Sequence, residues 1–322
     1  MQEKTLVLLV NTGSPSAPTA RALKPYLEAF LSDQRVIELP RWFWQPILHA
    51  FVLRTRPEKS ARRYRKIWLP EGSPLIVYTE RLVKALRGRF GKHVEVDMAM
   101  RIGFPGIERV LQERQAQGFT RFVIFPMFAQ YATQTTESVL DAVKDFARKT
   151  KKPFNWTSIG AFYRHPLLIE ALAEKIARSR TDASTHLLMS FHGIPVKSIR
   201  NGSPYEKQCL EMARLLAARL HLPEGGFSVA FQSRFGGDRW LQPYFPDHMR
   251  SLLKRGIGRV DVVCLSFSVD CLETLEEIAI EHRDEFLAMG GQSFHYIGCL
   301  NDDEAAVRAY ESIISEALTG IQ

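Results

Sequence analysis

Short runs of apolar residues, rich in β-branched side chains, recur along the chain, and each of them ends abruptly at turn residues. The runs lie at residues 6–15, 94–103, 121–128, 186–195, 227–236 and 259–268. Runs without polar alternation are typical of strands that are buried on both faces of a parallel sheet. Amphipathic helical patterns separate them, as at residues 204–220. The alternation predicts βαβ units and thus an α/β fold.

The order of short motifs indicates that the chain contains two similar halves. GSP at 13–15, RIG at 101–103 and the segment 117–125 are matched by GIP at 193–195, RFG at 234–236 and the segment 255–263. One match alone would be weak, but three matches in the same order favour a duplicated α/β domain. We expect the junction near residues 150–182, and we divide the chain into a first half at 1–160 and a second half at 161–322.

The carboxyl ends of the predicted strands are the expected place for ligands, because open parallel sheets bind them there. This rule selects residues 11–12, 191–192, 232–234 and 268–273. Neither G-x-G-x-x-G nor G-x-x-x-x-G-K-[ST] follows any of these runs, so the α/β pattern gives no reason to propose a nucleotide.

His192 is the first candidate for chemistry, because it leaves a buried run and is followed at once by Gly193 and Pro195. A histidine side chain ordinarily has a pKa of about 6.5, which suits proton transfer, and its neutral ring suits a metal ion. The alternative is a histidine that only caps the following turn. In the same way, Trp240 either stacks on a flat ligand or fills the core.

Glu273, Glu277 and Glu281 follow the last apolar run at intervals of four residues, which places them on one face of a helix. A solvated acidic face is the alternative interpretation. Glu273 favours a functional role because it lies at the helix start, beside the strand end. With His192 it offers fewer ligands than a stable zinc site, but it can accept protons or hold a divalent cation loosely. Both abilities fit a reaction through which a metal passes.

Composition and charge add limits rather than a function. The net charge of +8 favours anionic partners, but no nucleic-acid-binding motif is present, and we expect no nucleic-acid partner. The basic cluster at 54–66 is also typical of a solvated helix face. Four cysteines without a C-x-x-C pair indicate cytosolic usage rather than a disulfide framework. The apolar segment 42–53 is too short to span a bilayer, so it forms either a surface lip that touches a membrane or a flat ligand, or a buried helix.

A series of motifs across nearly the whole chain resembles the ferrochelatase family. The motifs are LLVNTGSP at 8–15, YRKIW and GSPLIVYTERL within 64–82, FAQYATQTTES at 128–138, SFHGIP at 190–195, FQSRFG at 231–236, WLQPY at 240–244 and DCLETLEEI at 270–278. They come in the order of the family. The resemblance implies two similar Rossmann-like domains, each a parallel four-stranded sheet flanked by helices, with the active-site cleft between them and a porphyrin-cleft lip on the first.

The resemblance also implies the reaction, which is insertion of Fe²⁺ into protoporphyrin IX to form protohaem in the last step of haem biosynthesis. Coproporphyrin, the substrate of one bacterial branch, is the alternative. Porphyrin and Fe²⁺ are then substrates, and no permanently bound cofactor is expected. By resemblance, the catalytic residues are His192 and Glu273, which take up the pyrrole protons; whether His192 is base, metal ligand or both stays open.

The remaining residue roles are likewise implied by the resemblance. Metal contacts are expected from His192, Glu273, Glu277 and Glu281; porphyrin contacts from Thr12, Arg63, Tyr64, Ser73 and Trp240; and support from Asp270. We expect a monomeric enzyme of the cytoplasm, with peripheral contact to an anionic inner membrane as an open alternative.

The chain departs from the family pattern at three places. Position 271 is cysteine where many members carry histidine, and Ser266 stands where related bacterial sequences tend to have glycine. The chain ends at Gln322 without the cysteine-bearing extension of animal members, so we predict no [2Fe–2S] cluster. Two other functions remain as alternatives: a cobalt chelatase for a different tetrapyrrole, and a haem or porphyrin carrier.

Overall fold

The structure is a computed structural model that describes residues 3–234, 237 and 239–320. The chain divides into two compact units. The first unit runs to Phe128, takes up Ala132–Gly160 and includes the chain from Glu311 onward. The second unit comprises Ala129–Tyr131 and Ala161–Tyr310. These units differ from the expected halves in their short exchanged segments, and the division at 1–160 and 161–322 as separate domains stays a prediction.

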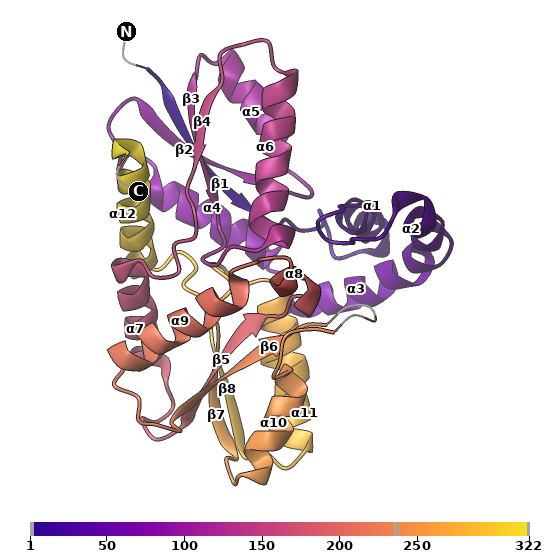
Figure 1. Cartoon of the computed structure of the whole chain (residues 1–322), viewed down its shortest axis with the longest axis vertical. Helices are drawn as coiled ribbons and strands as arrows, with labels where there is room; N and C mark the ends of the chain where they lie inside the picture. Colours follow the sequence, from indigo (N-terminus) through magenta and orange to yellow (C-terminus); the bar gives the residue numbers. More distant parts are fainter. Residues whose placement is uncertain (1–2, 235–236, 238, 321–322) are drawn as a thin grey trace. The chain divides into compact units, whose positions relative to one another are not determined.

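The first unit is built on a parallel four-stranded sheet with the strand order β2-β1-β3-β4 (Figure 1). Its strands are β1 (Thr5–Asn11), β2 (Val94–Met100), β3 (Arg121–Pro126) and β4 (Asn155–Ser158). Every residue of β1 is buried, as the uninterrupted apolar run predicts for a central strand. The helices of this unit are α1 (Ala20–Leu31), α2 (Arg41–Ile47), η1 (Leu48–Val52), α3 (Leu53–Ile67), α4 (Pro74–Leu86), α5 (Ile107–Ala116), η2 (Thr133–Glu137) and α6 (Ser138–Lys149), where η marks a π-helix.

The second unit repeats this plan with the strand order β6-β5-β7-β8, again all parallel. Its strands are β5 (His186–His192), β6 (Phe227–Gln232), β7 (Arg259–Cys264) and β8 (Ser293–Ile297). Its helices are α7 (Pro166–Ser179), α8 (Val196–Arg200), α9 (Tyr205–Arg219), α10 (Phe245–Lys254), η3 (Leu272–His282) and α11 (Arg283–Ala288). The last helix, α12 (Glu304–Thr319), begins in the second unit and ends in the first.

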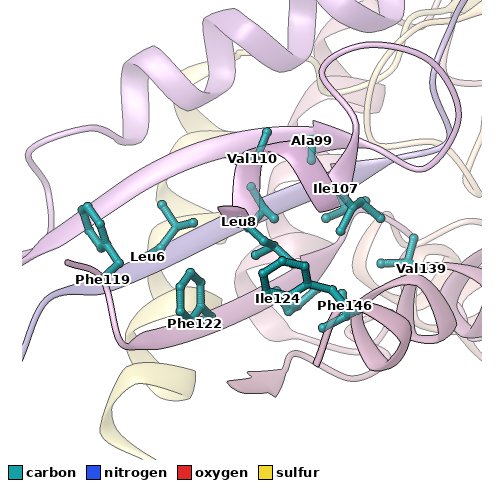
Figure 2. Close-up of a cluster of buried hydrophobic side chains, with 13 residues drawn as sticks. Leu6, Leu8, Ala99, Ile107, Val110, Phe119, Phe122, Ile124, Val139 and Phe146 are labelled. Carbon is teal, nitrogen blue, oxygen red and sulfur yellow. The ribbon is translucent and has the colours of Figure 1, made fainter. Parts of the chain in front are cut away.

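Equivalent helices cover one face of each sheet. In the first unit, buried side chains of α5 and α6 pack on β1 and β3 (Figure 2). The side chains include Leu6, Leu8, Ile107, Phe122, Ile124, Val139 and Phe146. In the second unit, Phe245 and Met249 of α10, Ile278 of η3 and Phe286 of α11 pack on the strands in the same way. Each such side chain contributes about 1.5–3 kcal/mol when it leaves water.

The duplicated fold predicted from the sequence is confirmed by the two sheets. The matched motifs at 13–15 and 193–195 directly follow β1 and β5, which are the second strands in their sheets. The third strand of each unit is followed by a π-helix, η2 after β3 and η3 after β7. Residues 235–236, part of the second matched motif, lie outside the described residues. The repeat therefore holds at the level of strand order and of the elements that follow the strands.

A chain of hydrogen bonds involving two histidines ties β5 to β6 at the end of the sheet away from the ligand-binding edge. The His186 ring lies against the Gly225 carbonyl (Nδ1···O 3.1 Å) and the Ser228 hydroxyl (Nε2···Oγ 2.8 Å), and His248 Nε2 lies 2.8 Å from the same hydroxyl. A carbonyl only accepts, so Nδ1 of His186 donates to Gly225 and Nε2 accepts from Ser228. Burial lowers the pKa of His186 to about 4 and also lowers the pKa of His248.

We expect this network to make the protein sensitive to acid. An unfolded histidine takes up its proton near pH 6.5, whereas folded His186 does so only near pH 4. The contribution of neutral His186 to the free energy of unfolding is therefore complete above about pH 6.5. It is lost as the pH falls toward 4, by at most about 1.4 kcal/mol per pH unit. The thermal unfolding midpoint should fall further between pH 7.5 and pH 5 in the native chain than in His186→Gln. Parallel falls in the two proteins would contradict this prediction.

Candidate active site

His192 ends β5, and its backbone is held by hydrogen bonds on both sides. Its amide donates to the Ser266 hydroxyl (3.1 Å), and its carbonyl accepts from the Tyr205 hydroxyl (2.8 Å). The two hydroxyls also contact each other at 2.7 Å. Tyr205 is buried, whereas the His192 ring is half-buried and lies edge-on to Phe267 at 6.2 Å between centroids. The serine that departs from the expected glycine at position 266 therefore helps to fix this strand end.

The ring of His192 has one nitrogen committed to the backbone. Nδ1 lies 2.7 Å from the carbonyl oxygen of Gly193, and because a carbonyl can only accept, Nδ1 carries the hydrogen. In the neutral ring, Nε2 then keeps its lone pair. This is the tautomer that can take a proton or bind a metal ion through Nε2.

Glu277 lies in a polar environment beside His192. The Ser233 hydroxyl is 2.8 and 2.7 Å from its two carboxylate oxygens, and His282 Nε2 is 3.8 Å from Oε1. Burial raises the pKa of Glu277, but His282, Ser233 and the nearby His192 outweigh it and hold the pKa below its ordinary value. Glu277 is therefore kept as a carboxylate in a largely buried place.

His282 lies between the Glu277 carboxylate and Glu285 at the surface, and the π-helix places it there. Burial lowers the pKa of His282, but Glu277 and Glu285 reverse the shift and raise it overall. His282 Nδ1 is 2.8 Å from the half-exposed Glu285 carboxylate. Glu277 and His282 are five residues apart, which is the interval of a π-helix hydrogen bond, whereas in an α-helix they would point in different directions. The predicted helix is therefore present, and its π-helical form, which the sequence does not reveal, brings His282 to the site.

The start of η3 is fixed from two sides. The Glu273 carbonyl accepts from Gln232 Nε2 at 2.8 Å, and its half-buried side chain lies on the first turn. Asp270, which directly precedes the helix cap, is buried and accepts hydrogen bonds from side chains of β8, η3 and the segment before α12. Those donors are Tyr296 (2.6 Å), Thr274 (2.9 Å) and Asn301 (2.7 Å).

Comparison with known proteins decides the family to which this chain belongs. The model of the ferrochelatase family matches residues 4–318. The chain belongs to the ferrochelatase family. It is thus an enzyme that inserts iron into a porphyrin, a lyase that forms a nitrogen–metal bond.

Curated relatives agree with the family assignment. The ferrochelatase of Aromatoleum aromaticum is 46% identical over 97% of this chain and 87% of its own length. The ferrochelatase of Nitrosococcus oceani is 43% identical over 98% of this chain and 87% of its own length. The enzyme is therefore favoured over the porphyrin carrier that the sequence left as an alternative.

Solved structures with a similar fold are chelatases as well. SirB from Bacillus subtilis with Fe³⁺ has a TM-score of 0.56 and 12% identity over 97% of this chain and 95% of its own. CbiX, described as the terminal enzyme of sirohaem biosynthesis in denitrifying bacteria, has a TM-score of 0.50 and 15% identity over 97% of this chain and 98% of its own. At such identities the likeness shows the fold alone.

The residues expected to contact porphyrin in this ferrochelatase lie on several elements. Trp240 is half-buried and lies against Gly193, where an added methyl group would come within 3.3 Å of its ring. Its indole nitrogen is buried and has no hydrogen-bond partner among the described residues. In the first unit, Thr12 is half-buried directly after β1, and its amide donates to the Asn11 side chain. Ser73 is buried, and its hydroxyl accepts from Ser14 at 2.6 Å.

Two further expected contacts lie on α3. Tyr64 is buried and its ring packs edge-on against Trp68, while Arg63 is half-buried. Most of the other basic residues of the cluster at 54–66 are exposed, so a solvated helix face describes that cluster well. The apolar segment before it is partly a surface feature, because Trp42 is 80% exposed and Phe51 is 70% exposed. The alternative of a wholly buried helix is wrong for these side chains.

The four cysteines are free and buried. Burial raises the pKa of each thiol well above its ordinary value, which keeps it protonated and poorly reactive. Cys271 stands where many family members carry histidine, and here it caps η3. Within the described residues, no group of three or more histidine, cysteine or acidic side chains is arranged to hold a metal ion.

The sequence did not identify His282, Tyr205 or Asn301 as parts of the site. Tyr205 and Asn301 lie outside the motifs, 13 residues from His192 and 31 residues from Asp270, and the fold brings them to these residues. His282 is next to the expected Glu281, but its approach to Glu277 depends on the π-helix. The residue spacing predicts a helix over this segment, but periodicity alone does not distinguish a π-helical turn from an α-helical one.

Proposed function

We propose that this ferrochelatase inserts Fe²⁺ into protoporphyrin IX, and that His192 and Glu273 remove the pyrrole protons. The observation that carries the proposal is the hydrogen bond of His192 Nδ1 to the Gly193 carbonyl, which leaves the Nε2 lone pair available at a strand end. Porphyrin metalation needs such a group, because each of the two pyrrole N–H bonds must give up its proton before the metal–nitrogen bonds are complete.

The steps follow from charge and proton balance. His192 Nε2 takes one pyrrole proton and becomes an imidazolium ion, which the Glu273 carboxylate stabilises; Glu273 takes the second proton. Fe²⁺ exchanges its water ligands for the four nitrogens, and its oxidation state does not change. The product is protohaem with two protons released, so no redox cofactor is required by this balance.

The acidic row has a separate role in the proposal. Glu277 and Glu281 hold Fe²⁺ loosely on its way to His192 and Glu273. The lowered pKa of Glu277 supports this role, because a carboxylate attracts a divalent cation and a carboxylic acid does not. Asp270 supports the row by holding the start of η3.

We assign porphyrin binding to Thr12, Arg63, Tyr64, Ser73 and Trp240. The Trp240 ring offers a flat apolar surface, and its indole N–H, which has no partner among the described residues, is a donor for a polar group of the ligand. The basic net charge of +8 suits a substrate that carries propionates. Burial of Tyr64 and Ser73 means that their contacts would be made with small exposed portions of the side chains.

The test is anaerobic turnover with Fe²⁺, followed through the absorption bands of the free porphyrin. Protoporphyrin IX and coproporphyrin III are compared in parallel, and Co²⁺ with sirohydrochlorin serves as a third reaction. The proposal expects catalytic loss of protoporphyrin IX. Turnover of coproporphyrin III alone would overturn the substrate assignment while keeping the chemistry, and preference for cobalt and sirohydrochlorin would overturn both.

We also propose a cytoplasmic monomer that contacts an anionic membrane through the segment 42–53. Buried free cysteines support a reducing compartment. Trp42 and Phe51 are exposed, and Phe51 lines one surface hollow with the exposed Arg54 and Arg56 of α3. Exposed aromatic and basic side chains together suit an anionic lipid surface. In the described part of the chain, no helix is long and apolar enough to cross a bilayer.

Substitution of Trp42 and Phe51 by serine is expected to weaken binding to vesicles that contain anionic lipid by about tenfold or more, because two aromatic side chains no longer leave water. Cosedimentation with the vesicles measures the change. Phe104→Ser is the matched control, since Phe104 is 63% exposed and lies outside this segment. Equal binding of the control and the double variant would contradict the prediction, as would a native chain that does not bind.

A further inference from the structure

Gln232 is the last residue of β6, and its backbone is attached to the turn that carries His192. It pairs with His192 in the parallel register of β5 and β6, and its carbonyl accepts from the Gly193 amide at 2.6 Å. An added methyl group at Gly193 would come within 3.0 Å of this carbonyl. The His192–Gly193 turn and the end of β6 are therefore packed closely together.

The side chain of Gln232 reaches the other proposed catalytic residue. Its Nε2 donates to the Glu273 carbonyl at 2.8 Å, and its Oε1 accepts from Ser190 Oγ at 2.8 Å and from Cys264 Sγ at 3.3 Å. The Glu273 carbonyl can only accept, so the amide orientation is fixed by chemistry. Gln232 is fully buried, and each polar group of its side chain has a partner.

These contacts make Gln232 a link between the sheet and the first turn of η3. Ser190 belongs to β5 and Cys264 to β7, so the Oε1 end is anchored in the sheet, while the Nε2 end holds the first turn of η3. The next residue, Ser233, has a left-handed backbone (φ +60°), and its hydroxyl bonds both oxygens of Glu277. The end of β6 thus contacts the turn of His192 and two turns of η3.

We propose that Gln232 is a positioning residue that sets the separation between His192 and Glu273. The inference rests on the proposed roles of those two residues. A helix start held through one backbone carbonyl moves when that bond is lost, and the Glu273 side chain moves with it. Misplacement of a reacting group by about 1 Å can cost on the order of 10²-fold in rate.

The chemistry explains why the residue is glutamine. Glutamate would direct a second acceptor at the Glu273 carbonyl, and methionine would leave that carbonyl and the Ser190 hydroxyl without their present partner. Asparagine keeps an amide in the buried site but is one carbon shorter, so it cannot reach both the sheet and η3. Methionine therefore tests whether the amide is needed, and asparagine tests whether the amide must extend as far as glutamine places it.

The experiment compares Gln232→Met with Ser190→Ala in the full chain, measuring kcat for Fe²⁺ insertion, the porphyrin dissociation constant and the thermal midpoint. Ser190→Ala removes one hydrogen bond at the Oε1 end but leaves the bond between Nε2 and Glu273. We expect kcat to fall about 10- to 100-fold in Gln232→Met and to change little in Ser190→Ala. Porphyrin binding should stay the same in both, and both midpoints should fall.

Equal kcat values in the two variants would overturn the inference, as would a loss in Gln232→Met that appears only in porphyrin binding. If Gln232→Met does not fold, Gln232→Asn takes its place with the same expected loss of kcat. His192→Ala and Glu273→Gln are measured alongside. Should those two variants retain turnover, the proposed function fails; should they lose it while the Gln232 variants do not, only the positioning role fails.

Discussion

Replacement of His192 by alanine is expected to lower kcat for iron insertion by about 10²–10⁴-fold while the porphyrin still binds. The loss is large because the hydrogen bond from Nδ1 to Gly193 aims the single available nitrogen, Nε2, away from the backbone. Alanine removes the proposed base and leaves β5 and its backbone hydrogen bonds in place. Anaerobic turnover gives the rate, and the shift of the porphyrin absorption bands on titration with protein gives the binding.

The matched control is His221→Asn. His221 is exposed and has a left-handed backbone (φ +51°), a conformation that asparagine tolerates better than alanine. The control is expected to keep full turnover. Turnover of His192→Ala within a few fold of the control would remove His192 from the proposed mechanism, whereas a loss of porphyrin binding would reassign it to substrate recognition.

Replacement of Glu273 by glutamine is expected to lower kcat by about 10²–10³-fold, as for other groups that stabilise charge in a transition state. The change removes the negative charge and the proton acceptor but keeps the side-chain shape and the backbone carbonyl that Gln232 binds. The loss should therefore appear in kcat, with unchanged porphyrin affinity. Single-turnover measurements with saturating Fe²⁺ separate this chemical step from metal delivery.

Glu224→Gln removes the same charge from an exposed loop of the second unit and is expected to leave the rate unchanged. If Glu273→Gln matches this control, the carboxylate takes no part in proton transfer. If high Fe²⁺ concentrations restore the rate of Glu273→Gln, the residue acts in metal binding rather than in proton removal.

The central parts of the fold were predictable because their signals are strong and local. All six apolar runs contain strands. The signal is clearest for the central strands β1, β3, β5 and β7, which are almost fully buried and therefore need continuous apolar sequence. The edge strands β4 and β8 were not located, because they are short and their side chains are largely half-exposed. The predicted helix at 204–220 is confirmed by α9 (Tyr205–Arg219), where the apolar period is that of an α-helix.

The sequence singles out His192, which ends β5, and Glu273, which lies in the first turn of η3, as candidates, and their catalytic roles remain proposals. The sequence does not single out hydrogen-bond partners that lie outside the motifs, such as Tyr205, whose hydroxyl binds the His192 carbonyl. Ser266 looked like a neutral departure from the family, but its hydroxyl binds the His192 amide. Hydrogen bonds of this kind depend on three-dimensional placement, and residue type alone does not reveal them.

The π-helical interval in η3 requires a fixed number of residues in that segment. Glu277 and His282 meet because five residues, not four, separate hydrogen-bonded neighbours along this helix. Removing one residue between them would allow an α-helix to form with little change in composition or hydrophobicity. The acidic row would then rotate relative to Ser233 and Gln232. Insertions and deletions should therefore be tolerated in surface loops of this enzyme but not within residues 272–282, where the residue count itself maintains the site.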